Sequence, residues 1–352
     1  MSLLARARPQ TLEAVLRDLG SRDARVRAET AQQAPNLVGD DRGELRTRVV
    51  EGLSRTLKDE HPAVRGAAAL ALADLDAHEA LPALLVAAED DEPTVRELAI
   101  TALGEIGDPR SYERVRRALR DSRPEVRFQA IVAFPRIARA AETQGVDEEI
   151  WSALSAGLVD EDPLVRGRAA EACAELADGA KLPSTMADRL ARLAADSEEP
   201  TDARIAATIA LGESGDRRAA PVLLACLRGE LDEKDPRRVQ AIHELVGELK
   251  IEEARPLLLA ASFGLRARFG DPSRRAAALI ALIRLGERRA IDHVLSELDA
   301  RGWERRVAAL GIVARTRLVE ARDRVRTMRE DSMTADIAAD VLAQLEGPEQ
   351  TS

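Results

Sequence analysis

A short pattern that returns at a fixed interval constrains this chain more than any other feature. An aspartate is followed by proline three residues later and then by a Val-Arg pair, as in Asp90, Pro93, Val95 and Arg96. The pattern starts at positions 59, 90, 121 and 160, so the first three copies are 31 residues apart. A period of this size indicates stacked structural repeats, in which each unit contacts its neighbours.

Each repeat is predicted to be a pair of helices. One apolar stripe at helical spacing indicates a helix over 93–106. Pro93 suits the first turn of this helix, where a missing N–H breaks no hydrogen bond, and the acidic residues before it favour the positive end of the helix dipole. A Gly-Asp-Pro turn at 107–109 precedes another amphipathic helix over 111–120. Neither helix can bury its stripe alone, so neighbouring pairs must stack.

Extending this spacing over the chain predicts an all-α protein of about ten helical hairpins. We expect one solenoid over 1–352, with an N-terminal cap pair in 1–43, central repeats in 44–315, and a C-terminal cap pair and polar tail in 316–352. The expected helix pairs are 11–19 with 24–38, 44–57 with 62–75, 78–88 with 93–106, 111–120 with 124–141, 148–158 with 163–177, 184–195 with 202–214, 218–227 with 237–249, 251–265 with 272–285, 290–298 with 304–315, and 319–328 with 334–345.

Composition and the N-terminal sequence narrow the class of protein. Residues 1–9 are interpreted as a short leader without the apolar core of a signal peptide, and no run of about 18 apolar residues indicates a transmembrane helix. We therefore expect a cytoplasmic protein that does not enter a membrane. Cys173 and Cys226 both lie in apolar helical contexts, which favours buried free thiols over a disulfide or a metal pair.

Two stretches of the sequence resemble a known repeat family. DEHPAVRGAAALALADLDAHEALPALL and DEPTVRELAITALGEIGDPRSYERV are similar to HEAT repeats, and most to the short type named after phycobilisome lyases. The resemblance covers 11–346 and is strongest over 59–176. It implies a right-handed α-solenoid that acts as a non-enzymatic scaffold or adaptor, binds a protein partner on the concave face of its inner helices, and needs no cofactor.

Some HEAT-like proteins are enzymes, so metal chemistry needs a separate test. Deoxyhypusine hydroxylase holds two irons with several His-Glu pairs, whereas this chain has only His78-Glu79 and His243-Glu244. Their positions in the repeat are neither equivalent nor adjacent, and a partly buried histidine beside a solvated glutamate explains each pair. His61 and His293 are taken to lack a cysteine or acidic partner at ligand spacing. We assign no metal site and no catalytic residue.

DNA glycosylases with HEAT-like repeats provide another enzyme class to consider. They pair an acidic residue with aromatic and basic groups, but the aromatic candidates here are scattered, and a lone tryptophan in a repeat helix is usually a core residue. The net charge of −10 also opposes binding to duplex DNA, because phosphate neutralisation supplies most of such affinity. A lyase or isomerase is suggested only by the name of the repeat type. The candidate aromatics are Trp151, Trp303, Phe263 and Phe269.

Charge is distributed unevenly along the chain. Residues 263–329 contain 16 arginines and 8 acidic residues, a net charge of +8, which leaves −18 for the rest. Aligning the second helix of every repeat on Val95 places one charged column at the position of Glu105, and stacking puts such a column on one continuous face. The column is mostly acidic and then becomes basic: Asp74, Glu105, Arg136, Glu175, Glu213, Glu248, Arg284 and Arg315.

A second column has arginine where the earlier repeats have the apolar Val95. At Arg238, Arg274 and Arg305, either the register slips by one residue or arginine emerges at that edge. The columns are explained either by a solvated surface or by a partner site. A protein partner is favoured, and a nucleic acid bound by the arginine-rich C-terminal repeats is the alternative. The candidate interaction residues are Glu105, Glu175, Glu213, Glu248, Arg274, Arg284, Arg305 and Arg315.

Overall fold

A computed structural model describes residues 11–39, 43–140, 148–177, 181–264, 271–331 and 333–346. Every regular element in these ranges is an α-helix or a 3-10 helix, and they contain no strand. The all-α prediction is therefore confirmed, and the helices form the stacked hairpins of an α-solenoid. The chain divides into two compact units, Met1–Leu176 (unit 1) and Ala177–Ser352 (unit 2).

Several predictions from the sequence concern residues outside these ranges. They are the leader at 1–9, the extra length at 142–147, the side chain of Phe269 and the tail beyond 346. Most of the loop expected at 39–43 also lies outside them. A single solenoid over the whole chain stays a prediction.

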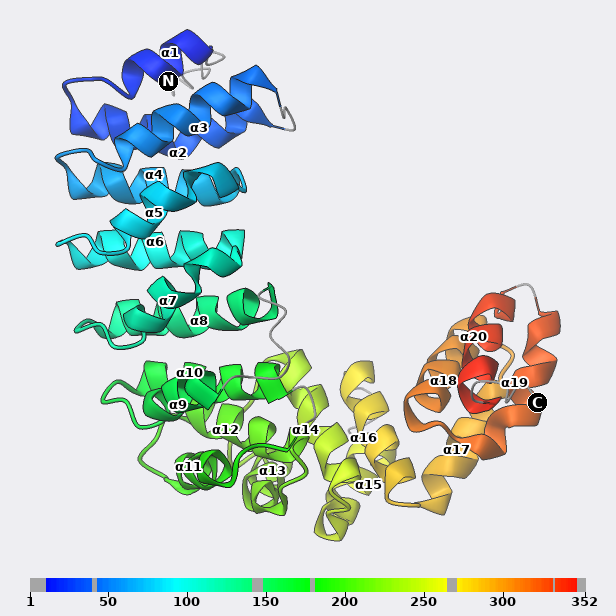
Figure 1. Cartoon of the computed structure of the whole chain (residues 1–352). Coiled ribbons are helices and arrows are strands. Elements are labelled where there is room, and N and C mark those ends of the chain that lie inside the picture. Colours follow the sequence, from blue (N-terminus) through cyan, green and yellow to red (C-terminus); the bar gives the residue numbers. More distant parts are fainter. Residues whose placement is uncertain are drawn as a thin grey trace, which may run out of the picture. The chain divides into compact units, whose positions relative to one another are not determined.

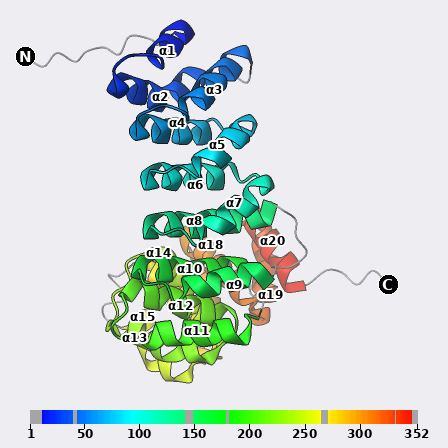
Figure 2. The ribbon, with the colours of Figure 1, turned by 60° about the vertical axis from the view of Figure 1, so that its left-hand side comes forward.

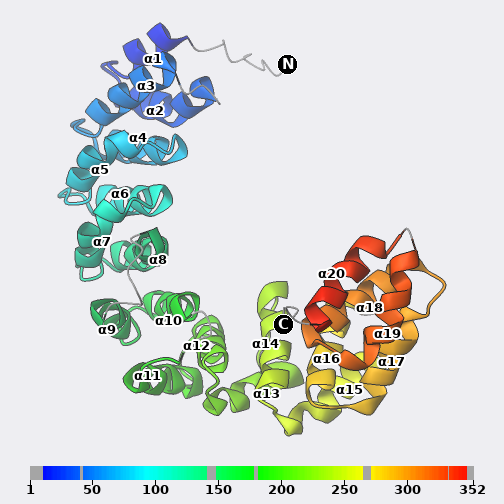
Figure 3. The ribbon, with the colours of Figure 1, turned by 45° about the vertical axis from the view of Figure 1, so that its right-hand side comes forward.

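Unit 1 consists of five hairpins, each with an odd-numbered first helix and an even-numbered second helix (Figure 1). Figure 3 shows α5 and α7 on one side of the stack and α4, α6 and α8 on the other. The bounds are α1 Leu12–Asp18, α2 Ala24–Val38, α3 Glu44–Thr56, α4 Pro62–Asp74, α5 Leu81–Ala87, α6 Pro93–Ile106, α7 Tyr112–Ala118, α8 Pro124–Ala140, α9 Glu148–Gly157 and α10 Pro163–Ala177.

Unit 2 repeats this arrangement with five further hairpins. Its second helices are the even-numbered α12 to α20, and α14 and α16 pack together, as do α16 and α18. The bounds are α11 Ser184–Ala195, α12 Thr201–Glu213, α13 Ala220–Arg228, α14 Pro236–Glu248, α15 Arg255–Phe263, α16 Pro272–Arg284, α17 Arg288–Leu298, α18 Trp303–Thr316, α19 Arg322–Thr327 and α20 Ala335–Glu346.

The predicted helices match the observed ones closely, with one systematic difference. Several first helices were expected to start at the turn itself, but a 3-10 helix precedes the α-helix there. Before α7 the reason is local, because Asp108 accepts a hydrogen bond from the backbone N–H of Arg110 and holds the first turn in the tighter form. The preceding helix α6 begins with Pro93 and ends at Gly107, whose φ of 68° is left-handed and suits glycine.

The second helices of unit 1 stack directly on one another. Helix α6 packs between α4 and α8, and Figure 2 shows these three helices as parallel layers. Leu103 is fully buried in this stack. A Cβ placed on Gly104 would lie 2.6 Å from the Cβ of Ala133 and 2.9 Å from its Cα. The crossing of α6 and α8 therefore requires glycine at position 104.

The aspartate and arginine of the repeated pattern bind each other across repeats in unit 1. Arg96 on α6 donates hydrogen bonds from Nε and Nη2 to the carboxylate of Asp121 in the next repeat, both at 2.8 Å. Its Nη1 donates to the Asp90 carbonyl at 2.9 Å. We call each such pair a rung and the series the aspartate–arginine ladder. The rungs are Arg27–Asp59, Arg65–Asp90, Arg96–Asp121 and Arg127–Asp160.

Unit 2 keeps the ladder at only one described rung. Arg306 on α18 binds Asp331 and donates to the Ala300 carbonyl. Arg204 on α12 instead donates to the carbonyl of Ala194, within its own hairpin. Helix α14 has Val239 at the ladder position, because its first residue Pro236 aligns with Pro93. The two units therefore connect successive repeats by different means.

Candidate binding surface

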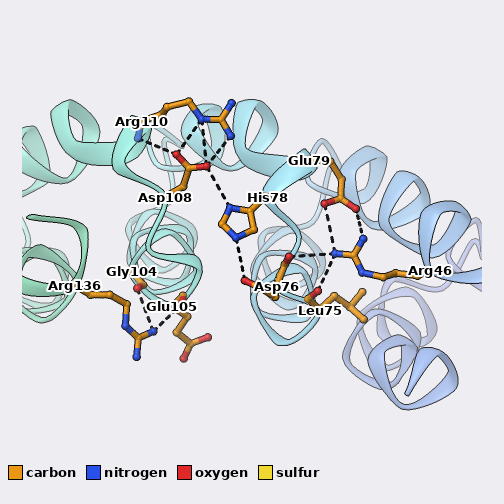
Figure 4. Close-up of polar contacts among 10 residues, drawn as sticks. All are labelled: Arg46, Leu75, Asp76, His78, Glu79, Gly104, Glu105, Asp108, Arg110 and Arg136. Atoms are coloured by element: carbon orange, nitrogen blue, oxygen red, sulfur yellow. Dashed lines mark hydrogen bonds and ion pairs between the residues drawn. The ribbon is translucent and has the colours of Figure 1, made fainter. Parts of the chain in front are cut away.

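The charged column lies at the C-terminal ends of the second helices, where arginines bind helix carbonyls. Arg136 of α8 donates from Nη1 to the carbonyl oxygens of Gly104 at 3.3 Å and Glu105 at 2.8 Å, at the end of α6 (Figure 4). Arg46 of α3 does the same at the end of α4. These oxygens have no partner within their own helix, and the helix dipole favours a cation there. Arg136 is therefore partly a capping residue.

Unit 1 has a groove of about 580 Å³ along this face, between α6, α8 and α10. Glu105, Arg136 and Glu175 line it, as the aligned column predicts. Arg168 also lines it and binds the Glu175 carboxylate at 3.1 Å. Arg139 donates to the Glu175 backbone carbonyl, at the end of α10. The groove therefore carries both signs of charge, partly neutralised within the protein.

The column changes from acidic to basic in unit 2, where ion pairs within the protein connect residues of the two signs. Arg284 of α16 binds the carboxylate of Glu248 on α14 at 2.7 Å and donates to the Arg315 carbonyl on α18 at 3.3 Å. Arg315 in turn binds Glu244 on α14. Sequence alignment found Glu248, Arg284 and Arg315 but missed Glu244, because Glu244 lies one helical turn before the column.

The predicted arginines do not form a single patch. Arg284 and Arg315 lie at the C-terminal ends of α16 and α18, whereas Arg274 and Arg305 lie near the N-terminal ends. Ten residues along a helix correspond to about 15 Å. Seven of the eight candidate interaction residues are exposed, and Arg284 is half-buried.

The register does not slip in the second arginine column. Arg306, directly after Arg305, occupies the ladder position and binds Asp331. Arg305 itself is exposed and its Nε binds the Glu297 carboxylate at 2.6 Å. Arg274 is also exposed and is followed by Arg275 at the ladder position. Of the two alternatives, arginine emerging at the edge is therefore confirmed for α16 and α18.

Sequence reasoning missed a pocket of about 740 Å³ between α16, α17 and α18. Arg275, His293 and Glu297 lie in its wall. His293 was expected to lack an acidic partner, which is wrong: Glu297 stands four residues later on α17, and its Oε1 is 3.9 Å from His293 Nε2. One helical turn brings such a pair together.

Two of the other histidines, His243 and His78, have structural partners. His243 is buried in α14, and its Nδ1 lies 2.7 Å from the Val239 carbonyl. Burial lowers its pKa, because the charged form would lose hydration. His78 lies between Asp108 and Asp76 in Figure 4, with Nδ1 3.3 Å from Asp108. Among the described residues, no group of three or more His, Cys, Asp or Glu side chains could hold a metal ion.

Two further predictions about single side chains have opposite outcomes. Cys173 and Cys226 are buried thiols, as expected, and burial raises the pKa of Cys173 to about 12. Trp303 was expected to be a core residue, but the side chain is 47% exposed at the first turn of α18. No helix in the described ranges is long and apolar enough to span a membrane.

Sequence comparison supports what the hairpin geometry indicates. A profile described as HEAT repeats matches residues 49–135, 82–150 and 151–245. The chain belongs to the HEAT-repeat family. Its HEAT hairpins are the stacked helix pairs described above. Among curated proteins, no sequence matches the chain.

Two solved structures share the HEAT solenoid fold at low sequence identity, and a third is similar over part of the chain. YibA of E. coli aligns with a TM-score of 0.57 and 19% identity, over 79% of this chain and 93% of YibA. The karyopherin Kap121p, bound to the extreme C-terminus of the protein phosphatase Cdc14p, aligns with a TM-score of 0.50 and 16% identity, over 95% of this chain and 41% of Kap121p. The CpcE–CpcF complex of phycocyanin lyase from Nostoc sp. PCC7120 aligns at 0.43 and 19% identity, over 70% of this chain and 97% of that one.

Proposed function

We propose that this protein is a non-enzymatic scaffold that binds a partner protein on the face formed by its second helices. The observation that carries the proposal is the charged column of unit 2 at the C-terminal ends of α12, α14, α16 and α18. There Glu213, Glu248 and Arg315 are exposed on the first, second and fourth hairpins of unit 2, and Arg284 of the third is half-buried. A surface with opposite charges at its two ends can orient a partner and speed its encounter.

The relatives support this class of function. HEAT solenoids present extended surfaces built from many repeats. Kap121p, which shares the fold, has been solved with the Cdc14p C-terminus and with Nup53p bound. A protein partner is the corresponding expectation here.

The arginine-rich repeats favour a protein partner over a nucleic acid. Many of their arginines are already held by carboxylates, so fewer charges remain to neutralise phosphates. The net charge of −10 acts in the same direction. The pairs include Arg284–Glu248, Arg288–Glu320, Arg305–Glu297, Arg306–Asp331, Arg315–Glu244 and Arg324–Asp299.

Exchanging the partners of an ion pair tests the proposal without breaking the pair. The variant Glu248→Arg/Arg284→Glu, combined with Glu244→Arg/Arg315→Glu, reverses the surface charge while each pair can still form. Simple reversal of the arginines would also leave Glu244 and Glu248 facing new acids. Affinity capture from native lysate, followed by mass spectrometry, should lose the protein partners of the unaltered chain.

A matched exchange on the first helices serves as the control, because it also swaps a glutamate and an arginine without changing the net charge. Arg288 on α17 binds Glu320 at 2.9 Å, and both side chains are largely exposed. The variant Arg288→Glu/Glu320→Arg should capture the same partners as the unaltered chain. If both exchange variants keep their partners and their helical signal, the charged column is not the binding surface. Selective loss of DNA or RNA would instead support the nucleic-acid alternative.

A further inference from the structure

The ladder shows which chemical group the arginine at this position of the repeat binds. In the four rungs of unit 1, Nε and Nη2 hold both oxygens of an aspartate at 2.6–2.8 Å. The aspartate always comes from the turn before the next second helix. For example, Asp121 binds Arg96 and also accepts the backbone N–H of Arg123 at 3.0 Å. The ladder position is therefore a carboxylate site with a fixed geometry.

One ladder arginine in unit 2 lacks the carboxylate that should follow it. Arg306 donates from Nη1 to the Ala300 carbonyl at 3.0 Å, as Arg96 does to the Asp90 carbonyl. Ala300 therefore occupies the place of Asp90, whose carboxylate is held by the arginine of the preceding second helix. On α16 that arginine is Arg275, and alanine offers it no carboxylate.

Arg275 is held in position by other groups and keeps unused donors. Its Nε donates to the Ser262 carbonyl at 3.0 Å, and its Nη2 lies 3.2 Å from His293 Nε2. Three of the five guanidinium N–H groups thus have no hydrogen bond within the described residues. Phe263 packs edge-on against His293 at 5.5 Å between ring centroids, which fixes the imidazole. Burial lowers the pKa of His293 and, together with the neighbouring arginines, outweighs Glu297, which raises it. The neutral ring then accepts from Arg275.

A pocket of about 740 Å³ lies at this point. Its two long walls are α16 and α18, and at Ala276 and Ala308 each contributes only a methyl group, so the space stays open. Leu279, Val294 and Ile312 give the pocket an apolar base, and all three are buried. Glu304 and Glu297 also line the pocket, and Arg305 binds Glu297. The site therefore combines apolar, acidic and cationic side chains, and Arg275 is the cation that keeps unused N–H donors.

We propose that this pocket binds an acidic peptide segment of a partner protein, whose Asp or Glu carboxylate completes the missing rung on Arg275. An apolar side chain next to that acid covers the base of the pocket. The four intact rungs identify the ligand class, and the unused N–H donors of Arg275 supply the complementary charge. The inference rests on the proposed scaffold function and gives it a second site, at the N-terminal halves of α16 and α18.

Selection of peptides on the full-length chain tests the ligand class directly. Immobilised protein is exposed to a phage-displayed library of random peptides, and the strongest binder is synthesised with a fluorescein label, together with its Asp→Asn and Glu→Gln counterpart. Selected sequences should share an acidic residue beside an apolar one. Fluorescence anisotropy should show that the amide counterpart binds about tenfold more weakly or worse, since a charge-assisted pair is lost.

Two variants of the pocket have matched controls. Arg275→Gln removes the positive charge and the guanidinium, and Ala300→Asp supplies the carboxylate within the chain, so each should weaken peptide binding by about tenfold or more. Ala300→Asn adds the same volume without charge, and Arg301→Gln removes an exposed positive charge beside the same turn. Both controls should bind the peptide normally, and circular dichroism should show all four proteins equally helical.

Several outcomes would overturn the proposal. They are selected peptides without acidic residues, no selected peptide at all, or undiminished binding by folded Arg275→Gln or Ala300→Asp. If Arg275→Gln fails to fold, the comparison of peptide binding by Ala300→Asp and by Ala300→Asn decides the question. The ion-pair exchanges at Glu248 and Arg284 lie at the other ends of the helices. If those exchanges lose protein partners and no acid-dependent peptide is selected, the scaffold function stands and the pocket is rejected as a peptide site.

Discussion

The two units of this HEAT protein have similar hairpins but use their arginines differently. In unit 1 the ladder arginines Arg27, Arg65, Arg96 and Arg127 all bind an aspartate of the next repeat, with side chains only 8–15% exposed. In unit 2, Arg204 and Arg275 bind carbonyls of their own hairpins. The same fold can therefore use one repeated position to join repeats or leave it for a ligand.

The difference begins with single residues, one in a turn and one on a second helix. Ala300 replaces the turn aspartate, and Val239 replaces the arginine on α14. Apolar stacking is retained in both units, since Leu103 in unit 1 and Leu282 in unit 2 are both fully buried. The ladder is thus an addition to the apolar stack and not a condition for it.

The largest expected effect comes from the apolar stack of unit 1. Leu103→Ala should lower the free energy of unfolding by about 2–5 kcal/mol, through lost apolar transfer and a cavity. Because repeats couple to nearest neighbours, hydrogen exchange should rise mainly in α6 and the adjoining helices. Val86→Ala, at an exposed site on α5, should change little. If α20 lost as much protection from hydrogen exchange as α6, all repeats would unfold as one cooperative array. That result would argue against a division into two units.

Removing a rung should have the next largest effect. Asp121→Asn should cost about 1.5–3 kcal/mol at pH 7, as expected for hydrogen bonds to a charged group. Urea denaturation measures this change. The matched substitution Asp299→Asn in unit 2 removes an exposed partner of Arg324 and should cost under about 1 kcal/mol. Equal costs would mean that the ladder contributes nothing special to unit 1.

The same rung predicts a dependence on pH. Burial alone would raise the pKa of Asp121, but hydrogen bonds from Arg96 and from the Arg123 N–H outweigh burial and lower it. A lowered pKa stabilises the folded state above the unfolded value of about 3.9, and this stability is lost as pH falls toward the folded value. The stability difference between the unaltered chain and Asp121→Asn should therefore shrink below about pH 4. A difference that grows with acid would contradict this sign.

Two glycines on second helices should respond in opposite directions. Gly104→Ala should destabilise unit 1 by about 1–3 kcal/mol, because its Cβ would meet the backbone of Ala133. A Cβ placed on Gly311 of α18 would meet no neighbouring helix within 4 Å, so Gly311→Ala should stabilise its helix by about 0.5–1 kcal/mol. Thermal unfolding of both variants measures the contrast. Destabilisation by Gly311→Ala would mean that α18 needs glycine for another reason.

The smallest expected effect is restoration of a rung in unit 2. Ala300→Asp should raise the free energy of unfolding by no more than about 1 kcal/mol, since the Arg275 guanidinium is already held by Ser262 and His293. Ala300→Asn should give no gain. A loss of stability in Ala300→Asp alone would show that residue 300 does not face Arg275.

Most of the helices follow from the order of residues alone. The apolar stripe of 93–106, Pro93 at the start and Gly107 at the end are local signals, and α6 has the predicted bounds. The repeat period likewise predicted that column residues of successive hairpins are neighbours, and Arg284 does contact both Glu248 and Arg315. Helical periodicity and stacking suffice for these features, because each depends on residues within one or two repeats.

What the local pattern could not determine is the partner of each charge. Asp90 was interpreted as favouring the positive end of its own helix, yet its carboxylate also holds Arg65 of the preceding repeat. Arg136 and Arg284 were read as surface charges, yet both cap helix ends of neighbouring repeats. Long side chains reach several ångströms, so small differences in helix packing decide which oxygen a guanidinium meets. Only the tertiary structure shows that Arg275 faces an open pocket where Arg96 and Arg306, at the same position of other repeats, bind aspartate.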